Sequence, residues 1–254
     1  MKKMKMLKVL SVLALVFMLV MNILANALPL NGVGTGEVSD FYFNLFAPAG
    51  YTFAIWGLIY LLLIGFSIGQ FMLQEEVLLG RIVPWFIVSS LANGVWIVAW
   101  HYYRPFVALV LILLILVSLA RICLILSEEK LSGRGFWLVR LPFSVYFGWV
   151  TVAVIANVTA LLVSLEQLGV LSLGLLALEF WTVLVLLVGM LIGVLVLVRL
   201  RSPAYGLVLG WSYLGIVVRH VLPWGFGGVY PVVVVVSSLG VVLFVVVSLK
   251  VRLS

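Results

Sequence analysis

Residues 140–163 read RLPFSVYFGWVTVAVIANVTALLV, a stretch long enough to cross a bilayer as a single helix. Within this stretch, Tyr146, Trp149, Ala153 and Asn157 follow one another at steps of three or four residues. At about 100° per residue, these positions fall within an arc of roughly 80° on a helix. The stretch therefore predicts a membrane-spanning helix with one stripe that carries a phenol, an indole, a small residue and an amide.

The amide of Asn157 limits what this stripe can face. An amide in contact with lipid would leave its donors and acceptors unpaired, which costs several kcal/mol in hydrocarbon. The stripe should therefore face other helices or a cavity. Two interpretations remain open at this point: the stripe packs helices together, or it contacts a ligand.

The composition of the whole chain is that of an integral membrane protein. Of its 254 residues, 66% are hydrophobic and 9% are charged, and the mean hydropathy is +1.36. This leaves too little polar surface to cover a soluble protein of this size. The apolar segments show no alternation with a period of two, and most approach the ~20 residues that a spanning helix needs. The expected fold class is an all-α integral membrane protein.

Eight apolar segments predict eight transmembrane helices. They cover approximately residues 1–27, 51–73, 82–102, 106–126, 140–163, 171–198, 204–222 and 229–249. A cleaved secretory signal is the alternative for residues 1–27, but the apolar run from Val9 to Leu24 is longer than many signal cores and favours an uncleaved helix. Residues 28–50, here called the first loop, are rich in glycine and aromatic residues and should fold over the mouth of the bundle.

The basic residues predict the topology. The net charge is +7, but the basic residues stand singly at segment ends instead of clustering with aromatic residues, so no nucleic-acid partner is expected. With eight helices, thirteen of the fifteen Lys and Arg residues fall on one side, and only Arg104 and Arg219 fall on the other. Basic loops are retained in the cytoplasm. We therefore expect a multi-pass protein of the cell membrane with both termini in the cytoplasm.

Residues that could catalyse a reaction are scarce. The histidines and the single cysteine form no group with metal-ligand spacing, and no glycine-rich phosphate loop opens a helix, so neither a metal site nor a catalytic residue is predicted. Glu179, inside the sixth span, and Arg219, at the end of the seventh, are candidates for an ion or proton site. The alternative is that Glu179 is protonated or forms a structural pair with Arg219.

Aromatic residues recur at helical spacing on two further spans, and on the third span an amide accompanies them. Trp56 and Tyr60 lie on the second, and Asn93 and Trp96 on the third. Trp and Tyr often act only as anchors at the membrane interface, which suits Trp85, Trp137 and Trp224. The polar neighbours on each stripe instead favour convergence on an interior space, which would suit a flat apolar ligand with a few polar edges.

Taken in order, these motifs resemble those of the TspO/MBR family, the tryptophan-rich sensory proteins that include the translocator protein or peripheral benzodiazepine receptor. The family's fifth helix carries Y-x-x-W-x-x-x-A-x-x-x-N, its third N-x-x-W, its second W-x-x-x-[YF] and its first loop W-Y-x-x-L-x-x-P. The matching residues are Tyr146, Trp149, Ala153 and Asn157; Asn93 and Trp96; Trp56 and Tyr60; and Phe41, Tyr42, Leu45 and Pro48.

The resemblance implies two domains: a five-helix TspO-like transmembrane domain at residues 1–165, and a transmembrane extension of three helices at residues 166–254. It further implies a sensor or binding protein whose pocket, covered by the first loop, takes a porphyrin or a sterol-like or lipid-like ligand. Ala153 would leave room for that ligand. The candidate ligand-binding residues are Tyr42, Trp56, Tyr60, Asn93, Trp96, Tyr146, Trp149, Ala153 and Asn157.

No cofactor is required by this interpretation, and a tetrapyrrole such as protoporphyrin or a haem-like molecule would be a ligand. The expected partners are the lipid bilayer and this small molecule, together with a second copy of the chain in a homodimer. Two other functions remain open. One is a small-molecule transporter that uses Glu179, and the other is a porphyrin-modifying enzyme.

Overall fold

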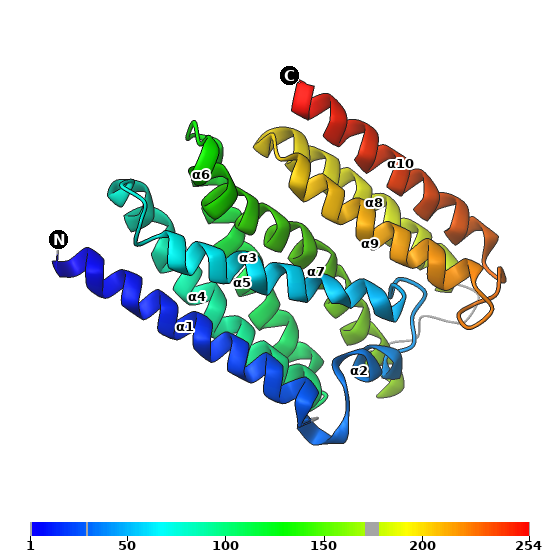
Figure 1. Ribbon diagram of the computed structural model, residues 1–254. Coiled ribbons are helices and arrows are strands. Elements are labelled where there is room, and N and C mark those ends of the chain that lie inside the picture. Colours follow the sequence, from blue (N-terminus) through cyan, green and yellow to red (C-terminus); the bar gives the residue numbers. More distant parts are fainter. Residues whose placement is uncertain (1, 29, 171–177, 254) are drawn as a thin grey trace. The chain divides into compact units, whose positions relative to one another are not determined.

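The computed structural model describes residues 2–28, 30–170 and 178–253, and every regular element in these ranges is helical (Figure 1). The all-α prediction is therefore confirmed. The long helices are α1 (Lys2–Ala27), α3 (Ile55–Gly69), α4 (Glu76–His101), α5 (Pro105–Ser127), α7 (Leu141–Gln167), α8 (Leu178–Leu200), α9 (Pro203–Val221) and α10 (Pro231–Leu253). The short elements are η1 (Leu30–Gly32), α2 (Thr35–Phe41), η2 (Gly50–Ala54), α6 (Gly133–Gly135) and the π-helical turn η3 (Phe136–Arg140).

Each of the eight predicted spans overlaps one of the long helices. Among the described residues, seven helical segments are long and apolar enough to cross a membrane. The 19-residue helix α9 is not one of them, because its glycines, Ser212, Arg219 and His220 lower its hydropathy. These helices are those of a multi-pass membrane protein, and the number of eight crossings remains a prediction.

Several helix ends differ from the predicted ones. The third span was expected to start near Ile82, but α4 begins at Glu76, and the second span was expected to continue to Leu73, but α3 ends at Gly69. Phe53, three residues before Trp56, lies in the 3₁₀ turn η2 and not in α3. Hydropathy marks the part of a helix that suits hydrocarbon, whereas backbone hydrogen bonding decides where the helix starts and stops. Residues 171–177, where the sixth span was expected to start, lie outside the described residues.

Packing divides the chain into two compact units. The first contains Met1–Thr35 and Trp56–Val150, and the second contains Gly36–Ile55 and Thr151–Ser254. Helix α7 contributes to both. These units are defined by which residues pack together. The domain boundary expected after residue 165 is defined by the length of the family resemblance, so it remains a prediction.

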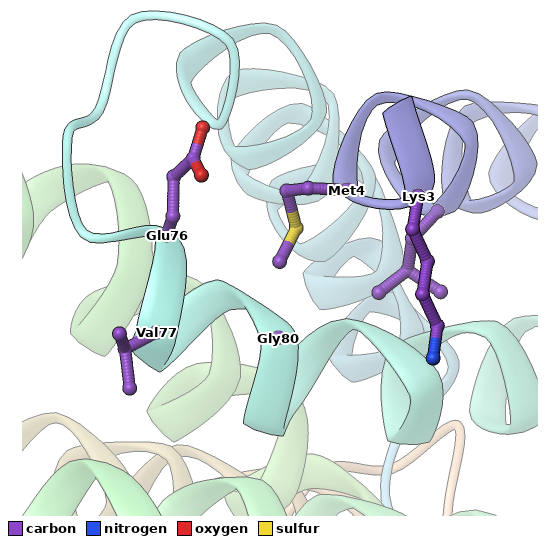
Figure 2. Close-up of a pocket in the computed structure, with 6 residues that line it drawn as sticks. Lys3, Met4, Glu76, Val77 and Gly80 are labelled. Carbon is purple, nitrogen blue, oxygen red and sulfur yellow. The ribbon is translucent and has the colours of Figure 1, made fainter. Parts of the chain in front are cut away.

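In the first unit, α4 packs between α1 and α5 (Figure 1). The rings of Phe66, Phe86 and Phe143 meet edge to face, with centroids 4.8–5.6 Å apart, and join α3, α4 and α7. A cavity of about 470 Å³ lies between the beginnings of α1 and α4. Figure 2 shows Lys3 and Met4 on one side of it and Glu76 on the other. These contacts place the first residues of α1 beside the first turns of α4.

In the second unit, α9 packs on α8 and α10, and α8 also contacts α10. The Tyr213 hydroxyl of α9 donates a hydrogen bond of 2.7 Å to the Leu186 carbonyl of α8, and its ring lies 5.2 Å from Phe244 of α10. Gly240 on α10 has no space for a Cβ because the Tyr213 ring lies against it. Small residues thus bring these three helices close together, as is common between membrane helices.

Candidate functional site

Four aromatic side chains of the first unit gather around Trp56. Their ring centroids lie 5.7 Å (Tyr60), 6.2 Å (Trp96), 5.9 Å (Tyr146) and 6.2 Å (Trp149) from the Trp56 ring. The Tyr60 ring is stacked, and those of Tyr146 and Trp149 are edge-on. These separations are those of favourable aromatic pairs. We call this group, which joins α3, α4 and α7, the aromatic cluster.

The two rings from α3 differ in exposure from the other three. Trp96, Tyr146 and Trp149 are buried, whereas Trp56 and Tyr60 are half-buried. The side chains of α4 and α7 therefore form the fixed part of the cluster, and those of α3 form its accessible part.

A buried chain of hydrogen bonds runs beside the cluster and ends at one of its members. The Asn22 amide donates to Asn93 Oδ1 over 2.8 Å, and the Asn93 amide donates to the Tyr146 hydroxyl over 3.0 Å. Asn22 also donates to the Met18 carbonyl, one turn earlier in α1. Asn93 was expected at the site, and Asn22 was not. The only signal for Asn22 was an amide within the apolar run from Val9 to Leu24.

The aromatic side chains continue from the cluster to the beginning of the first loop. Trp100 stacks on Trp96 at 6.0 Å, and its indole nitrogen donates to the Thr35 carbonyl over 3.2 Å. His101 is fully buried, and its two ring nitrogens lie 3.0 Å from the Thr35 hydroxyl and 3.2 Å from the Leu30 carbonyl. These contacts hold residues 30–35 against the end of α4.

A family model described as TSPO-like protein matches residues 8–249 of the chain. The chain belongs to this TSPO-like family. The match continues through α8, α9 and α10, so it does not set residues 166–254 apart as an extension of a five-helix core. No curated protein and no solved structure matches the chain.

Membership in the family and the buried aromatic cluster are together compatible with a binding protein embedded in the membrane. Six of the candidate residues of this TSPO-like protein lie together in the first unit: Trp56, Tyr60, Asn93, Trp96, Tyr146 and Trp149. The remaining three, Tyr42, Ala153 and Asn157, belong to the second unit.

Asn157 satisfies one of its donors within its own helix, because its amide donates to the Ala153 carbonyl over 2.9 Å. Tyr42 is buried in the first loop, next to an Asn44 turn: the Asn44 amide donates to the Tyr42 carbonyl, and Asn44 Oδ1 accepts from the backbone of Phe46 and Ala47. Turns of this kind fix the path of a loop. The TSPO-like chain thus holds Tyr42 in a defined backbone conformation.

Glu179 and Arg219 do not form a pair in the second unit. Arg219 instead forms an ion pair of 2.8 Å with Asp40 of α2, and it also donates to the Pro48 carbonyl. Glu179 lies in the first turn of α8, and its Oε1 is buried without a hydrogen-bond partner among the residues described. Within the same residues, no group of three or more His, Cys, Asp or Glu side chains could hold a metal ion.

Proposed function

We propose that this TSPO-like protein binds a flat, largely apolar ligand, either a tetrapyrrole or a sterol-like lipid, at the aromatic cluster. The observation that carries the proposal is the position of Trp56, whose ring contacts four others from three helices beside the Asn22–Asn93–Tyr146 chain. Aromatic faces provide stacking area for a planar ligand, and a few polar groups orient it. A sensing role would follow from this binding.

The packing of the rings indicates how a ligand would enter. A planar ligand needs about 3.5 Å on each of its faces, so it cannot lie between two rings that already touch. One ring has to swing away. Trp56 and Tyr60 are the half-buried members, and both belong to α3. We therefore expect the α3 side of the cluster to open when ligand binds, while the α4 and α7 side remains in place.

The first prediction tests this site with protoporphyrin and the full-length protein in lipid nanodiscs. Trp56→Leu and Trp149→Leu should each weaken binding by about tenfold, or ~1.4 kcal/mol, because each removes a stacking surface. Binding is measured by quenching of indole emission, with empty nanodiscs correcting for porphyrin dissolved in lipid. Trp137→Leu is the matched control, because this indole is 62% exposed and lies outside the cluster.

Equal affinity in all three variants and the wild type would show that the cluster only packs helices. A loss shared by Trp137→Leu would indicate a general effect of removing an indole.

A transport function is the second candidate, and Glu179 is the observation that favours it. A buried carboxylate oxygen without a described partner is a typical carrier of a proton or ion in membrane proteins. Transport would require flux of ligand across vesicles that depends on this carboxylate, whereas binding alone would not.

A further inference from the structure

The second unit contains a cavity of about 330 Å³ between the first loop and the segment that follows α9. Asp40 and Phe43 line it from the first loop, Arg219 from the last turn of α9, and Trp224 and Phe226 from the following segment. Sites for small molecules commonly measure ~300–1,000 Å³ and combine apolar walls with a few polar groups. This cavity has both properties, and none of the residues of the aromatic cluster line it.

Arg219 is held by the protein, while its counter-ion faces water. The guanidinium lies 2.8 Å from Asp40 Oδ1, within 3.4 Å of the Pro48 carbonyl and 5.4 Å from the centroid of the Phe226 ring. The Arg219 side chain is only 20% exposed, but that of Asp40 is 61% exposed. An ion pair with an exposed partner contributes little to stability, so Asp40 can be replaced by another carboxylate at small cost.

The wall opposite the first loop is fixed before any ligand binds. Phe226 donates from its backbone to the Arg219 carbonyl over 2.9 Å, and Gly228 donates to the His220 carbonyl over 2.7 Å. Gly225 allows the chain to turn back onto the end of α9, because a Cβ at this position would collide with the Arg219 carbonyl. The Phe226 ring packs on His220 at 4.6 Å. The backbone that carries the wall therefore needs no rearrangement to receive a ligand.

We propose that this cavity is a binding site for an amphiphilic carboxylate of the fatty-acid class. Arg219 binds the carboxylate, because a guanidinium presents paired donors that match its two oxygens. The Asp40 carboxylate occupies this position in the structure, and it moves away from Arg219 when the ligand binds. The hydrocarbon chain lies against Phe43, Trp224 and Phe226. The site goes beyond the proposed function, because it lies in the second unit and does not use the aromatic cluster.

The exposure of the rings agrees with such an occupant. Phe43 and Trp224 are 52% and 63% exposed, so a chain that leaves the cavity can pass over them into the bilayer. Anchoring at the membrane interface alone would also place aromatic rings here. It would not account for a cavity with a protein-held arginine at its wall, and these are the features that select a carboxylate.

The test uses the full-length protein in nanodiscs and a photoactivatable palmitate analogue, with its methyl ester and the corresponding alkylamine as comparison probes. Cross-linked peptides are mapped and quantified by mass spectrometry. The acid should label the segments around Phe43 and Trp224, with half-saturation at about tenfold lower concentration than the ester or the amine, because only the acid pairs with Arg219. Equal labelling by the three probes would refute the proposal.

Four variants assign the effect to the ion pair. Asp40→Asn removes the competing carboxylate and should tighten binding of the acid by about three- to tenfold, whereas Arg219→Gln should remove the preference for acid over ester. Arg219→Lys keeps the positive charge and should keep a weaker preference for acid over ester. This result would show that the loss in Arg219→Gln comes from the missing charge and not from a loosened first loop. Arg104→Gln is the matched control, since this arginine is exposed in the first unit.

Two outcomes would overturn the assignment to Arg219. One is unchanged or weaker binding in Asp40→Asn, and the other is full selectivity for the acid in Arg219→Gln. Trp149→Leu should leave the labelling unchanged even if it abolishes porphyrin binding. This separates failure of the carboxylate site from failure of the proposed function.

Discussion

Asn22, Asn93 and Tyr146 bring three polar groups into an apolar environment and satisfy them with one another. Hydrogen bonds between membrane helices contribute about 0.6–2 kcal/mol each, so their value lies as much in geometry as in stability. This chain of hydrogen bonds fixes the Tyr146 hydroxyl against α4 and thereby sets the 65° angle between the Tyr146 and Trp56 rings. We infer that the polar chain positions the aromatic cluster.

At Glu179, a conservative substitution separates a structural role from a role in transport. Glu179→Gln keeps the size of the side chain and removes the carboxyl group that could carry a proton or an ion. Because Oε1 has no partner among the described residues, we expect the melting temperature to change by less than about 2 °C. Under the transport hypothesis, ligand flux into vesicles should be lost. Both quantities are measured on the same preparation.

The two measurements on Glu179→Gln can also contradict the hypothesis. A stable variant with full flux would remove Glu179 as a transport site. A marked drop in melting temperature would show that the carboxylate supports the fold instead.

The sequence allowed part of the candidate site to be predicted at the level of single residues. The spacing of Trp56 and Tyr60, and of Asn93 and Trp96, reports which side chains share a helical face, and these faces do meet in the first unit. The partner of Asn93 could not be predicted, because Asn22 lies 71 residues away and is specified by the packing of α1 on α4. The partner of Arg219 could not be predicted either. It is Asp40 and not Glu179, and no local sequence pattern relates α2 to α9.

At the level of elements, hydropathy located the long helices because each has to suit hydrocarbon along its central part. It did not locate the 3₁₀ turn η2, which depends on a contact with α9. The Ala49 backbone donates to the Gly215 carbonyl over 3.0 Å, and the Trp211 indole donates to the Thr52 carbonyl over 3.1 Å. The end of the first loop therefore contacts a helix much later in the chain: Thr52 and Trp211 are 159 residues apart.

Gly215 provides a test of this attachment. A Cβ at Gly215 would collide with the Thr52 side chain and lie 3.0 Å from that of Pro48, so Gly215→Ala should push the loop away from α9 at a cost of about 1–3 kcal/mol. Hydrogen exchange at the amide of Ala49 should then become faster. Mass spectrometry of peptides that cover residues 44–55 measures this change.

The matched control for Gly215→Ala is on the same helix. At Gly210, the nearest atom to an added Cβ is 3.8 Å away, which is an ordinary contact. Gly210→Ala should therefore leave exchange at Ala49 unchanged and add a little helix propensity. If exchange is equally slow in both variants, the contact at Gly215 does not hold the first loop.

At the scale of the whole molecule, charged groups from distant parts of the sequence meet at one end of the first unit. Arg81, near the start of α4, pairs with Glu128 and Glu129 just after α5, at 3.4 and 3.3 Å. Arg140 donates to the carbonyls of Leu126 and Glu129 and so caps the end of α5. Lys3 lies beside the beginning of α4 (Figure 2). Three of the basic residues expected in the cytoplasm, Lys3, Arg81 and Arg140, thus lie at one end of this unit.

Thiol labelling can assign this end to a side of the membrane. Basic residues near helix ends are retained on the cytoplasmic side, so the end that carries Lys3, Arg81 and Arg140 should be cytoplasmic. In a Cys123→Ala background, Ser132→Cys, next to this end, should resist an impermeant thiol reagent in intact cells. Ser39→Cys, in the first loop, should react, and Ser132→Cys should become reactive once the cells are permeabilised. The reverse pattern would invert the topology of the whole chain.

The same labelling decides whether α9 crosses the membrane. If α8, α9 and α10 all cross, the exposed positions Arg201 and Val229 lie on opposite sides, because α9 separates them. Arg201→Cys should then resist the reagent and Val229→Cys should react. Labelling of both from one side would mean that α9 returns to the surface from which it started, and the C-terminus would then lie outside. The glycines and polar groups of α9 make it a poor match for lipid. However, α8 and α10 cover Gly206 and Gly210, and the first loop covers Gly215 and pairs with Arg219, so we expect α9 to cross.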